Sequence, residues 1–320
     1  MSTPFRDDIV FQETDDVGII IFNRPKDLNA VNLHMIFSIG GILEDFEKFK
    51  SLVIVKSVVP KVFSAGGDIV RVTELVKLKD KTCLYYPRYG YKMIHSIGTM
   101  KIPFVALNDG LTMGGGAGIS MLSKYFVCTE NTDFSMPEVR MGHFADVCSS
   151  YFLARLDNHL GFYLALTGAR LKGYDNVLAG IATHFCPSEK IAELEVALLN
   201  NPQEADAIIK SFSAVPENAN FSLTPHLEKI ERIFSSETVE EILAKLEQDG
   251  SKWAKTTIAT IRYMCPLSLK ATLRQLRIAK TMSLEQCIQN EYILANSFFQ
   301  GENFVEGKPI SRRGIVIIFP

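Results

Sequence analysis

The N-terminal half of the sequence repeats one local pattern: a short apolar run, a loop and then a helical stretch. Val17–Phe22, Leu52–Val59 and Pro103–Leu107 are mainly apolar runs of strand length, and each is followed by residues typical of loops. Strands that alternate with helices in this way are typical of α/β domains with parallel strands, so we predict that fold class. No sequence period accompanies the pattern, which argues against a repeat protein.

One helix of this half can be delimited from its own residues. Asn32 is a favourable N-terminal cap, and Ile36, Ile39 and Leu43 would share one face of the helix that follows. The pattern predicts that this helix ends near Lys50.

The pattern changes after Pro187, where strand-like runs stop and helical periodicity dominates. Ser283 and Gln286 have the spacing of a capping box at the start of the last helix. We therefore predict a core over residues 1–187 and a helical part over residues 188–320. The predicted helices of this second part are Ala192–Leu199, Glu204–Phe212, Val239–Gln248, Pro266–Ile278 and Ser283–Phe299.

The charge balance argues against nucleic acid as a partner. Lysine and arginine total 34, aspartate and glutamate total 36, and the formal net charge is −2. A nucleic-acid-binding protein usually carries a basic excess or a basic stripe, and neither is visible in this sequence.

The sequence shows no pattern typical of a metal site, a disulfide framework or a membrane segment. The 6 cysteines include no CxxC pair and the 6 histidines no HExxH pair, so we predict reduced thiols and no metal site. No apolar run approaches the roughly 18 residues that a membrane span needs. The first residues show neither a secretory signal nor an arginine-rich presequence, so we predict an intracellular chain without a membrane segment.

Two glycine-rich segments follow strand-like runs. Val62–Asp68 contains Gly66 and Gly67, and Met113–Gly118, which follows a predicted turn at Asn108–Gly110, contains three successive glycines. We read both segments as loops that lead into helices. Amides in such loops can point at one developing negative charge, although the same glycines would also serve tight turns without any ligand. Neither segment fits a dinucleotide or phosphate-loop fingerprint.

Two carboxylates lie in a short irregular stretch. Glu138 follows a proline and Asp146 follows a glycine-containing segment, so both are predicted on a loop. They could act as general base, nucleophile or water-orienting group, or they could be ordinary solvated acids. His143 and Cys148 raise a cysteine–histidine nucleophile as an alternative, but five residues of separation say little about contact, and a buried or incidental cysteine is the favoured reading.

Taken in order, these segments resemble the crotonase (enoyl-CoA hydratase/isomerase) superfamily. Within it, the closest resemblance is to hydrolases of 3-hydroxyisobutyryl-CoA, through Ala165–Phe185, Val239–Gly250 and Pro266–Gln275, and it extends over roughly residues 10 to 307. The motifs shared with the superfamily as a whole are Asn23–Pro25, Leu28–Ala30, Phe63–Ile69, Met113–Gly116, Met136–Glu138, Leu166–Gly168 and Ala179–Ala182.

The resemblance implies a fold and a set of binding residues. The fold would be a spiral of ββα units followed by a helical C-terminal part. The backbone amides of Gly67 and Gly115 would form an oxyanion hole for a thioester carbonyl. The residues implied to hold the CoA part or line the acyl site are Arg24, Lys26, Asn29, Ala30, Ser64, Ala65, Gly66 and Gly90.

The resemblance also bears on the reaction. Hydratases of the superfamily carry a glutamate at the position of Gly118, whereas the hydrolases pair a glutamate with an aspartate eight residues later, as Glu138 and Asp146 do here. Glu138 would be general base or nucleophile, and Asp146 would position the substrate hydroxyl or water. Three departures stand out. Cys148–Ser150 replaces three glycines, whose loss could crowd the acyl pocket or reshape the helix start. Gly90 replaces a substrate-lining glutamate, and the tail diverges after Gly307.

The expected function is therefore hydrolysis of 3-hydroxyisobutyryl-CoA, or of a close short 3-hydroxyacyl-CoA, in valine breakdown. Enoyl-CoA hydration or isomerisation, and a catalytically weak CoA-binding relative, are the alternatives. No cofactor is expected, because CoA is part of the substrate. The resemblance further implies a homo-oligomer, a trimer or hexamer, and a mitochondrial location, with the cytoplasm as the alternative because no presequence is visible.

Overall fold

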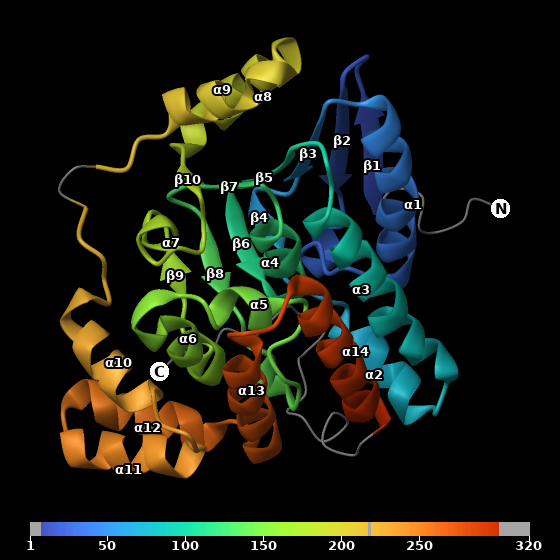
Figure 1. The fold of residues 1–320 in the computed structure, drawn as a ribbon. Coiled ribbons are helices and arrows are strands. Elements are labelled where there is room, and N and C mark those ends of the chain that lie inside the picture. The colour runs from blue at the N-terminus through green and yellow to red at the C-terminus, as the bar shows by residue number, and fades with distance from the viewer. Residues whose placement is uncertain (1–7, 217–218, 301–320) are drawn as a thin grey trace.

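The strands form two sheets that the chain enters in turn (Figure 1). The structure is a computed structural model that describes residues 8–216 and 219–300. One sheet has six strands and the other has four. The predicted α/β class is confirmed.

The six-stranded sheet has the strand order β1-β2-β3-β5-β7-β10. β1 runs antiparallel to β2, and every other pair in the sheet is parallel. All residues of β2 are buried, as expected for a parallel strand that is covered on both faces. The strands are β1 (Ile9–Glu13), β2 (Val17–Phe22), β3 (Leu52–Ser57), β5 (Phe104–Asn108), β7 (Tyr125–Cys128) and β10 (His184–Phe185).

The four-stranded sheet has the order β4-β6-β8-β9, in which the first three strands are parallel and the last pair is antiparallel. Its strands are β4 (Lys61–Ser64), β6 (Gly110–Met113), β8 (Asp133–Ser135) and β9 (Leu171–Lys172). β4, β6 and β8 each follow a strand of the larger sheet directly in the chain. Alternation between two sheets, with helices between successive pairs, gives the ββα spiral that the resemblance implied.

Two predicted irregular segments are wrong in part. Val62–Asp68 was expected as a loop, yet its beginning belongs to β4, and the turn at Asn108–Gly110 overlaps the start of β6. These strands are too short to show a periodicity of their own, and pairing with neighbouring strands forms them. Gly110 allows the closest approach: with φ of 148°, a Cβ there would lie 2.0 Å from the carbonyl carbon of Lys61.

The helices of the core connect the strand pairs. The cap at Asn32 is confirmed, because its side chain accepts a hydrogen bond from the Met35 amide. Gly114–Gly116, expected as a loop, forms the first turn of α4 instead. The small residues let this helix lie close to β4, since a Cβ on Gly116 would sit 2.5 Å from the Cβ of Ser64. The helices are α1 (Leu33–Phe49), α2 (Ile69–Lys77), α3 (Tyr85–Gly98), α4 (Gly114–Met121), α5 (Ser149–Leu153), α6 (Leu160–Thr167) and α7 (Asp175–Leu178).

Every described element after β10 is helical, whereas residues 301–320 of the predicted helical part, with the divergent tail, lie outside the described residues. The five helices predicted there are present. The capping box is confirmed, because the side chain of Ser283 accepts a hydrogen bond from the Gln286 amide and the side chain of Gln286 accepts one from the Ser283 amide. Two further helices, α10 and α12, were not predicted. The α-helices are α8 (Ile191–Asn200), α9 (Ala205–Phe212), α10 (Leu227–Phe234), α11 (Val239–Asp249), α12 (Lys252–Tyr263), α13 (Pro266–Ala279) and α14 (Leu284–Gln300). Short 3₁₀ turns are η1 (Pro25–Asp27), η2 (Lys81–Leu84), η3 (Glu138–Met141), η4 (Asp157–His159), η5 (Ser188–Lys190), η6 (Pro202–Glu204) and η7 (Thr224–His226).

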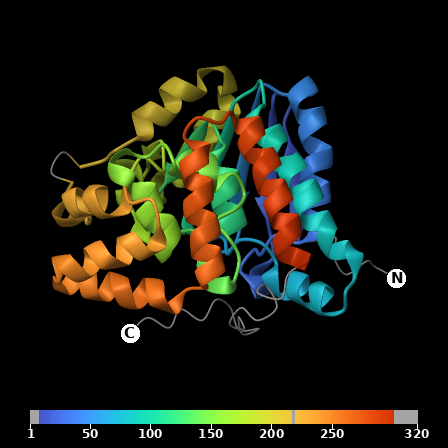
Figure 2. The ribbon, with the colours of Figure 1, turned by 60° about the horizontal axis from the view of Figure 1, so that its bottom comes forward.

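The helices after residue 187 share their apolar contacts with the sheets. Leu194 and Ile209 of α8 and α9 pack with Ile19 of β2 in one buried cluster. Another cluster joins Phe134 of β8 to Leu276 of α13. Figure 2 shows α14 beside α3 and α13 in front of the central elements. The C-terminal helices are thus built onto the core around the site described below.

The close approach at Gly110 predicts a large effect of a single methyl group. Gly110→Ala forces backbone apart at a position with positive φ, and we expect unfolding free energy to fall by at least about 2 kcal/mol. The matched control is Gly41→Ala on α1, where a Cβ meets nothing within 4 Å and should stabilise the helix by roughly 0.5–1 kcal/mol. Urea unfolding at constant m-value measures both. Equal midpoints for the two variants would contradict this account.

Candidate active site

Two glycines, Gly67 and Gly115, lie close together where the β4–α2 loop meets the start of α4. A Cβ on Gly115 would lie 3.3 Å from the Gly67 nitrogen, so the two residues are neighbours. Val31 donates to the Gly66 carbonyl at 2.7 Å and accepts from the Asp68 amide at 3.0 Å. Within the described residues the Gly67 amide donates to no other backbone group, and the Gly115 amide lies in a first helical turn that supplies no acceptor. Two such donors can stabilise an oxyanion.

The loops predicted to hold CoA are fastened to one another by buried side chains. The Ser64 hydroxyl donates to the Asn29 carbonyl at 2.8 Å and accepts from the Gly66 amide at 3.1 Å. Asn29 donates to the Phe63 carbonyl at 2.9 Å. Asn29 and Ser64 are both fully buried, so their side chains shape the loops. Ala30 and Ala65 flank them and are half-buried.

Arg24 is surrounded by carboxylates. It pairs with Asp68 at 2.9 Å, Asp27 at 3.0 Å and Asp8 at 3.6 Å, and it donates to the Ala30 carbonyl at 2.8 Å. These contacts hold the turn between β2 and α1. Lys26 is exposed beside this network, and no ion pair from it occurs in the described part of the chain.

Gly90 lies within α3, with only one close neighbour for an added Cβ. Among the described residues, that neighbour is Ile36 Cδ1 of α1 at 4.0 Å. No recorded contact joins Gly90 to Glu138 or Asp146. Its role in lining the acyl site stays a prediction.

Glu138 is a buried carboxylate placed directly against the glycine turn. It begins η3, which follows β8, and its side chain is 3% exposed. A Cβ on Gly114 would lie 2.8 Å from Oε1, and neither carboxylate oxygen has a hydrogen-bond partner among the described residues. Burial raises the pKa of Glu138 well above its usual range, and the Asp146 and Glu291 carboxylates add to the effect. A buried carboxyl with a raised pKa is a candidate proton-transfer group.

Asp146 is the second predicted carboxylate, and it is partly exposed. Its Oδ2 lies 3.2 Å from Nε2 of His143, whose ring is buried and stacks on Phe299. The charge of Asp146 raises the pKa of Glu138, so the structure brings both predicted acids into one site.

The cysteine–histidine alternative has no support in the geometry. His143 faces Asp146, whereas Cys148 is fully buried in the apolar core. Burial raises the pKa of the Cys148 thiol further above its usual range, which disfavours the thiolate. The favoured reading of Cys148 as a buried cysteine is confirmed.

The position that separates hydratases from hydrolases has no space for a side chain. A Cβ on Gly118 would lie 2.7 Å from the Cβ of Val147 and 2.8 Å from its carbonyl oxygen. Val147 immediately follows Asp146. A glutamate at position 118 would therefore displace the turn that carries Asp146.

Glu291 of α14 is a site residue that sequence reasoning missed. It is fully buried and raises the pKa of Glu138. A signal was present, because Cys287, Glu291 and Ala295 recur every four residues on the apolar face of the last predicted helix. A carboxylate on such a face would be buried, and burial is costly unless hydrogen-bond donors or a cation surround it.

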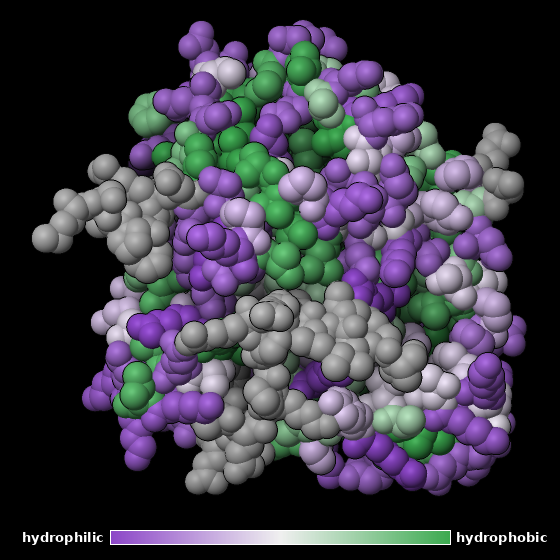
Figure 3. All heavy atoms as spheres, turned by 180° about the vertical axis from the view of Figure 1, so that it is seen from behind, coloured by the Kyte–Doolittle hydropathy of each residue, from purple (hydrophilic) through white to green (hydrophobic). Residues whose placement is uncertain are grey.

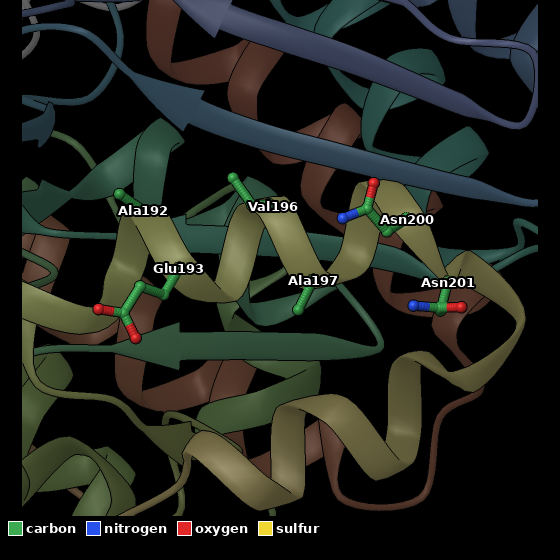
Figure 4. A pocket seen from close by; sticks show the side chains of 6 residues that line it. All are labelled: Ala192, Glu193, Val196, Ala197, Asn200 and Asn201. Atoms are coloured by element: carbon green, nitrogen blue, oxygen red, sulfur yellow. The ribbon is translucent and has the colours of Figure 1, made fainter.

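Other features bear on binding elsewhere. A pocket of about 570 Å³ lies along α8 (Figure 4) and contains none of the predicted site residues. On the rear face, a strip of hydrophobic residues runs between hydrophilic ones (Figure 3). Across residues 8–216 and 219–300, no helix is both long and apolar enough to cross a membrane, and no group of three acidic, histidine or cysteine side chains could hold a metal ion. The pocket is lined by Ala192, Glu193, Val196, Ala197, Asn200 and Asn201.

Comparison with known sequences gives a consistent family. The sequence profile of an enoyl-CoA hydratase/isomerase family matches residues 17–310. The mitochondrial 3-hydroxyisobutyryl-CoA hydrolase of Gallus gallus is 43% identical over 309 residues, which are 94% of this chain and 80% of that protein. The Homo sapiens protein of the same name is 40% identical over 314 residues, 95% of this chain and 81% of that protein.

Solved structures of the same fold agree. A carnitinyl-CoA dehydratase from Mycobacterium thermoresistibile has a TM-score of 0.89 at 28% identity, over 94% of this chain and 88% of that one. An enoyl-CoA hydratase from Rhodobacter sphaeroides has a TM-score of 0.83 at 29% identity, with the same coverages of 94% and 88%. The fold thus hosts more than one reaction, and the side chains of the site have to separate them.

Because the Glu138 carboxylate is buried without a hydrogen-bond partner among the described residues, we expect its ionised form to lower the free energy of unfolding. Its pKa is raised in the folded state, so its contribution to stability is fully present below about pH 4.3 and is lost as pH rises toward the folded pKa. We expect Glu138→Gln to raise unfolding free energy at pH 8 by at least about 1 kcal/mol, with a gain that shrinks at acid pH. Denaturant unfolding at several pH values measures it. The exposed Glu44→Gln on α1 is the control, and an equal gain from both variants would refute the explanation.

Proposed function

The chain belongs to the enoyl-CoA hydratase/isomerase family, and we propose that it hydrolyses the thioester of 3-hydroxyisobutyryl-CoA, or of a close short 3-hydroxyacyl-CoA, in valine breakdown. The observation that carries the proposal is the interacting pair of carboxylates, Glu138 and Asp146, with Glu138 lying against the glycine turn that adjoins Gly67. The relatives named 3-hydroxyisobutyryl-CoA hydrolase support it. The crowded Gly118 argues against the hydratase alternative, which needs a second glutamate there.

The amides of Gly67 and Gly115 bind the thioester carbonyl oxygen in this proposal. As water or a carboxylate attacks the carbonyl carbon, negative charge develops on that oxygen, and preformed donors stabilise it without reorganisation. One donor of this kind typically contributes about 10²–10³ in rate. Gly114 matters indirectly, because any side chain there would push Glu138 away from the reacting carbon.

Glu138 starts the reaction in one of two ways. As a general base it takes a proton from water while the water oxygen bonds to the carbonyl carbon, and collapse of the tetrahedral intermediate expels CoA as a thiolate that is then protonated. As a nucleophile it forms an acyl anhydride and releases CoA, and water then hydrolyses the anhydride. Single turnover in ¹⁸O-water can identify the nucleophilic route, because label enters Glu138 only when water attacks the Glu138 carbon of the anhydride. The general-base route puts the label in the product acid.

Asp146 positions the 3-hydroxyl group of the substrate or the attacking water. Its carboxylate is partly exposed, and one of its oxygens is oriented by the contact with His143. A short 3-hydroxyacyl group would place its hydroxyl within reach of a carboxylate next to the carbonyl. The preference for 3-hydroxy substrates follows from that contact.

CoA lies along the loops of residues 24–30 and 64–66 in this proposal. Lys26 is the exposed cation that can meet a phosphate, whereas Arg24 shapes the turn through its three carboxylate partners. Because CoA enters as part of the substrate and carries the leaving group, the reaction needs no further cofactor.

The setting of the enzyme follows from its relatives. Those named above are mitochondrial, and we propose the same compartment for this chain. We also propose a homo-oligomer, a trimer or a hexamer as in the superfamily, which light scattering of the purified chain can test.

Glu138→Gln tests the reaction directly. Removal of the base or nucleophile should lower thiol release from 3-hydroxyisobutyryl-CoA by at least about 10²-fold, while CoA binding measured by calorimetry stays within about twofold. The exposed Glu189→Gln on η5 is the matched control and should keep full activity.

Three results would contradict the proposal. No thiol release by the unaltered chain, under conditions where a relative named 3-hydroxyisobutyryl-CoA hydrolase is active, would reject hydrolysis. Loss of enoyl absorbance with crotonyl-CoA would favour the hydratase alternative. CoA binding without turnover of any acyl-CoA would favour a CoA-binding protein.

A further inference from the structure

The carboxylate of Glu291 is fully buried, yet it accepts hydrogen bonds from several elements at once. Its Oε2 accepts from the Cys148 amide at 2.7 Å and from the Tyr91 hydroxyl at 3.1 Å. Its Oε1 accepts from Gln275 at 2.9 Å, from the Ser150 amide at 3.2 Å and from the Ser150 hydroxyl. A buried carboxylate is costly unless such donors surround it, so all five bonds count toward keeping it in place.

The donors belong to the turn that carries Asp146 and to the helices around it. Cys148 and Ser150 lie two and four residues after Asp146, at the N-terminal cap and in the first turn of α5, while Tyr91 lies on α3. Two further bonds hold the other side of the turn. Within α13, Thr272 accepts from the Ala145 amide at 3.1 Å and Gln275 donates to the Ala145 carbonyl at 3.3 Å.

The turn needs such support because its backbone is strained. Val147 has φ of 52° and Cys148 has φ of 65°, and both lie in the left-handed region. A β-branched residue there is an outlier, and each strained residue costs of order 1–3 kcal/mol unless the surroundings enforce it. Glu291 holds the amide of the second strained residue, so it counters relaxation of the turn toward ordinary backbone angles.

We propose that Glu291 is a positioning residue for the hydrolysis: by holding the amides of Cys148 and Ser150 it fixes Asp146 beside Glu138. The proposal rests on the proposed function for its kinetic consequence, but its structural consequence is independent of any substrate. It assigns a role in catalysis to the last described helix, which lies more than a hundred residues from the site in sequence.

The kinetic signature follows from where the contacts go. Glu291 contacts the Asp146 turn and not the loops of residues 24–30 and 64–66 that would hold CoA. Loss of these hydrogen bonds should therefore lower kcat and leave the affinity for free CoA unchanged. A misplacement of about 1 Å can cost on the order of 10²-fold in rate, which sets the expected size.

A pH signature accompanies the kinetic one. Burial raises the pKa of Glu291 to about 7, opposed by the hydrogen bonds from Ser150 and Cys148, while Asp146 adds to the rise. The other titratable groups around it are Tyr91 on α3, Cys148 before α5, Cys287 on α14 and Glu138 on η3. A protonated carboxyl loses one acceptor position, so the turn should loosen as pH falls below about 7.

Glu291→Gln in the full chain is the test. We expect kcat for 3-hydroxyisobutyryl-CoA to fall on the order of 10²-fold, with the affinity and stoichiometry of free CoA binding unchanged. Hydrogen exchange of a peptide covering residues 143–153, corrected for intrinsic rates, should be faster than in the unaltered chain at pH 8. Between pH 8 and pH 6 protection of this peptide should fall in the unaltered chain and stay constant in the variant.

Asp249→Asn is the matched control. Asp249 is a second well-shielded carboxylate of the helical part, bound by Lys229 and Ser251, and it lies on α11 away from the turn. We expect it to lower stability without changing kcat per CoA-binding site or exchange in residues 143–153. If both variants behave alike, Glu291 serves only the stability of the helical part and the proposal fails.

Smaller changes keep the proposal testable if Glu291→Gln does not fold. Ser150→Ala and Tyr91→Phe each remove one hydroxyl donor, and each should speed exchange of the turn and lower kcat in the same direction by a smaller factor. Unchanged exchange and unchanged kcat in both would overturn the proposal. If the unaltered chain hydrolyses no acyl-CoA but Glu291→Gln still loosens the turn, the proposed function fails while the positioning role stands.

Discussion

The close approach of two glycine turns is the constraint on which the rest of the structure depends. The loop after β4 and the first turn of α4 meet so tightly that an added Cβ on Gly115 would contact the Gly67 nitrogen. That contact requires β4 to lie against β6, and it therefore requires the chain to alternate between the two sheets. Glycine is needed here for proximity as much as for backbone freedom, because side chains would separate the two amides. The oxyanion site is in this sense a product of the ββα spiral.

Three carboxylates meet around this contact, and their surroundings make them different. Glu291 is fully paired with donors, Glu138 has none among residues 8–216 and 219–300, and Asp146 is partly exposed against a histidine. A carboxylate without donors in a dry site favours its protonated form and can exchange a proton with a substrate, whereas a fully paired one is better suited to hold structure. Two glutamates thereby take different roles, since Glu138 is suited to proton transfer and Glu291 to holding the structure of the site.

Much of the fold could be predicted, because its long elements carry their own signals. The cap at Asn32 and the capping box at Ser283 needed only local residues. β4 and β6 could not be found in this way, since four-residue strands form through pairing with partners. The site shows the same division. Glu138 and Asp146 were reached through motif resemblance, but Glu291 was passed over, although a carboxylate on an apolar helix face was visible in the sequence.

The segment Cys148–Ser150 shows why a departure from a family pattern has to be judged in three dimensions. Side chains in place of glycines suggested a crowded acyl pocket, yet Cys148 packs into the core and Ser150 turns its hydroxyl to Glu291. The left-handed φ of Cys148 is the remaining cost, and the bond from its amide to Glu291 acts on that same peptide unit. A strained turn can thus lose a glycine when a buried acceptor secures its backbone. The identity of residue 148 and the presence of a carboxylate at residue 291 are therefore physically coupled, although 143 positions separate them.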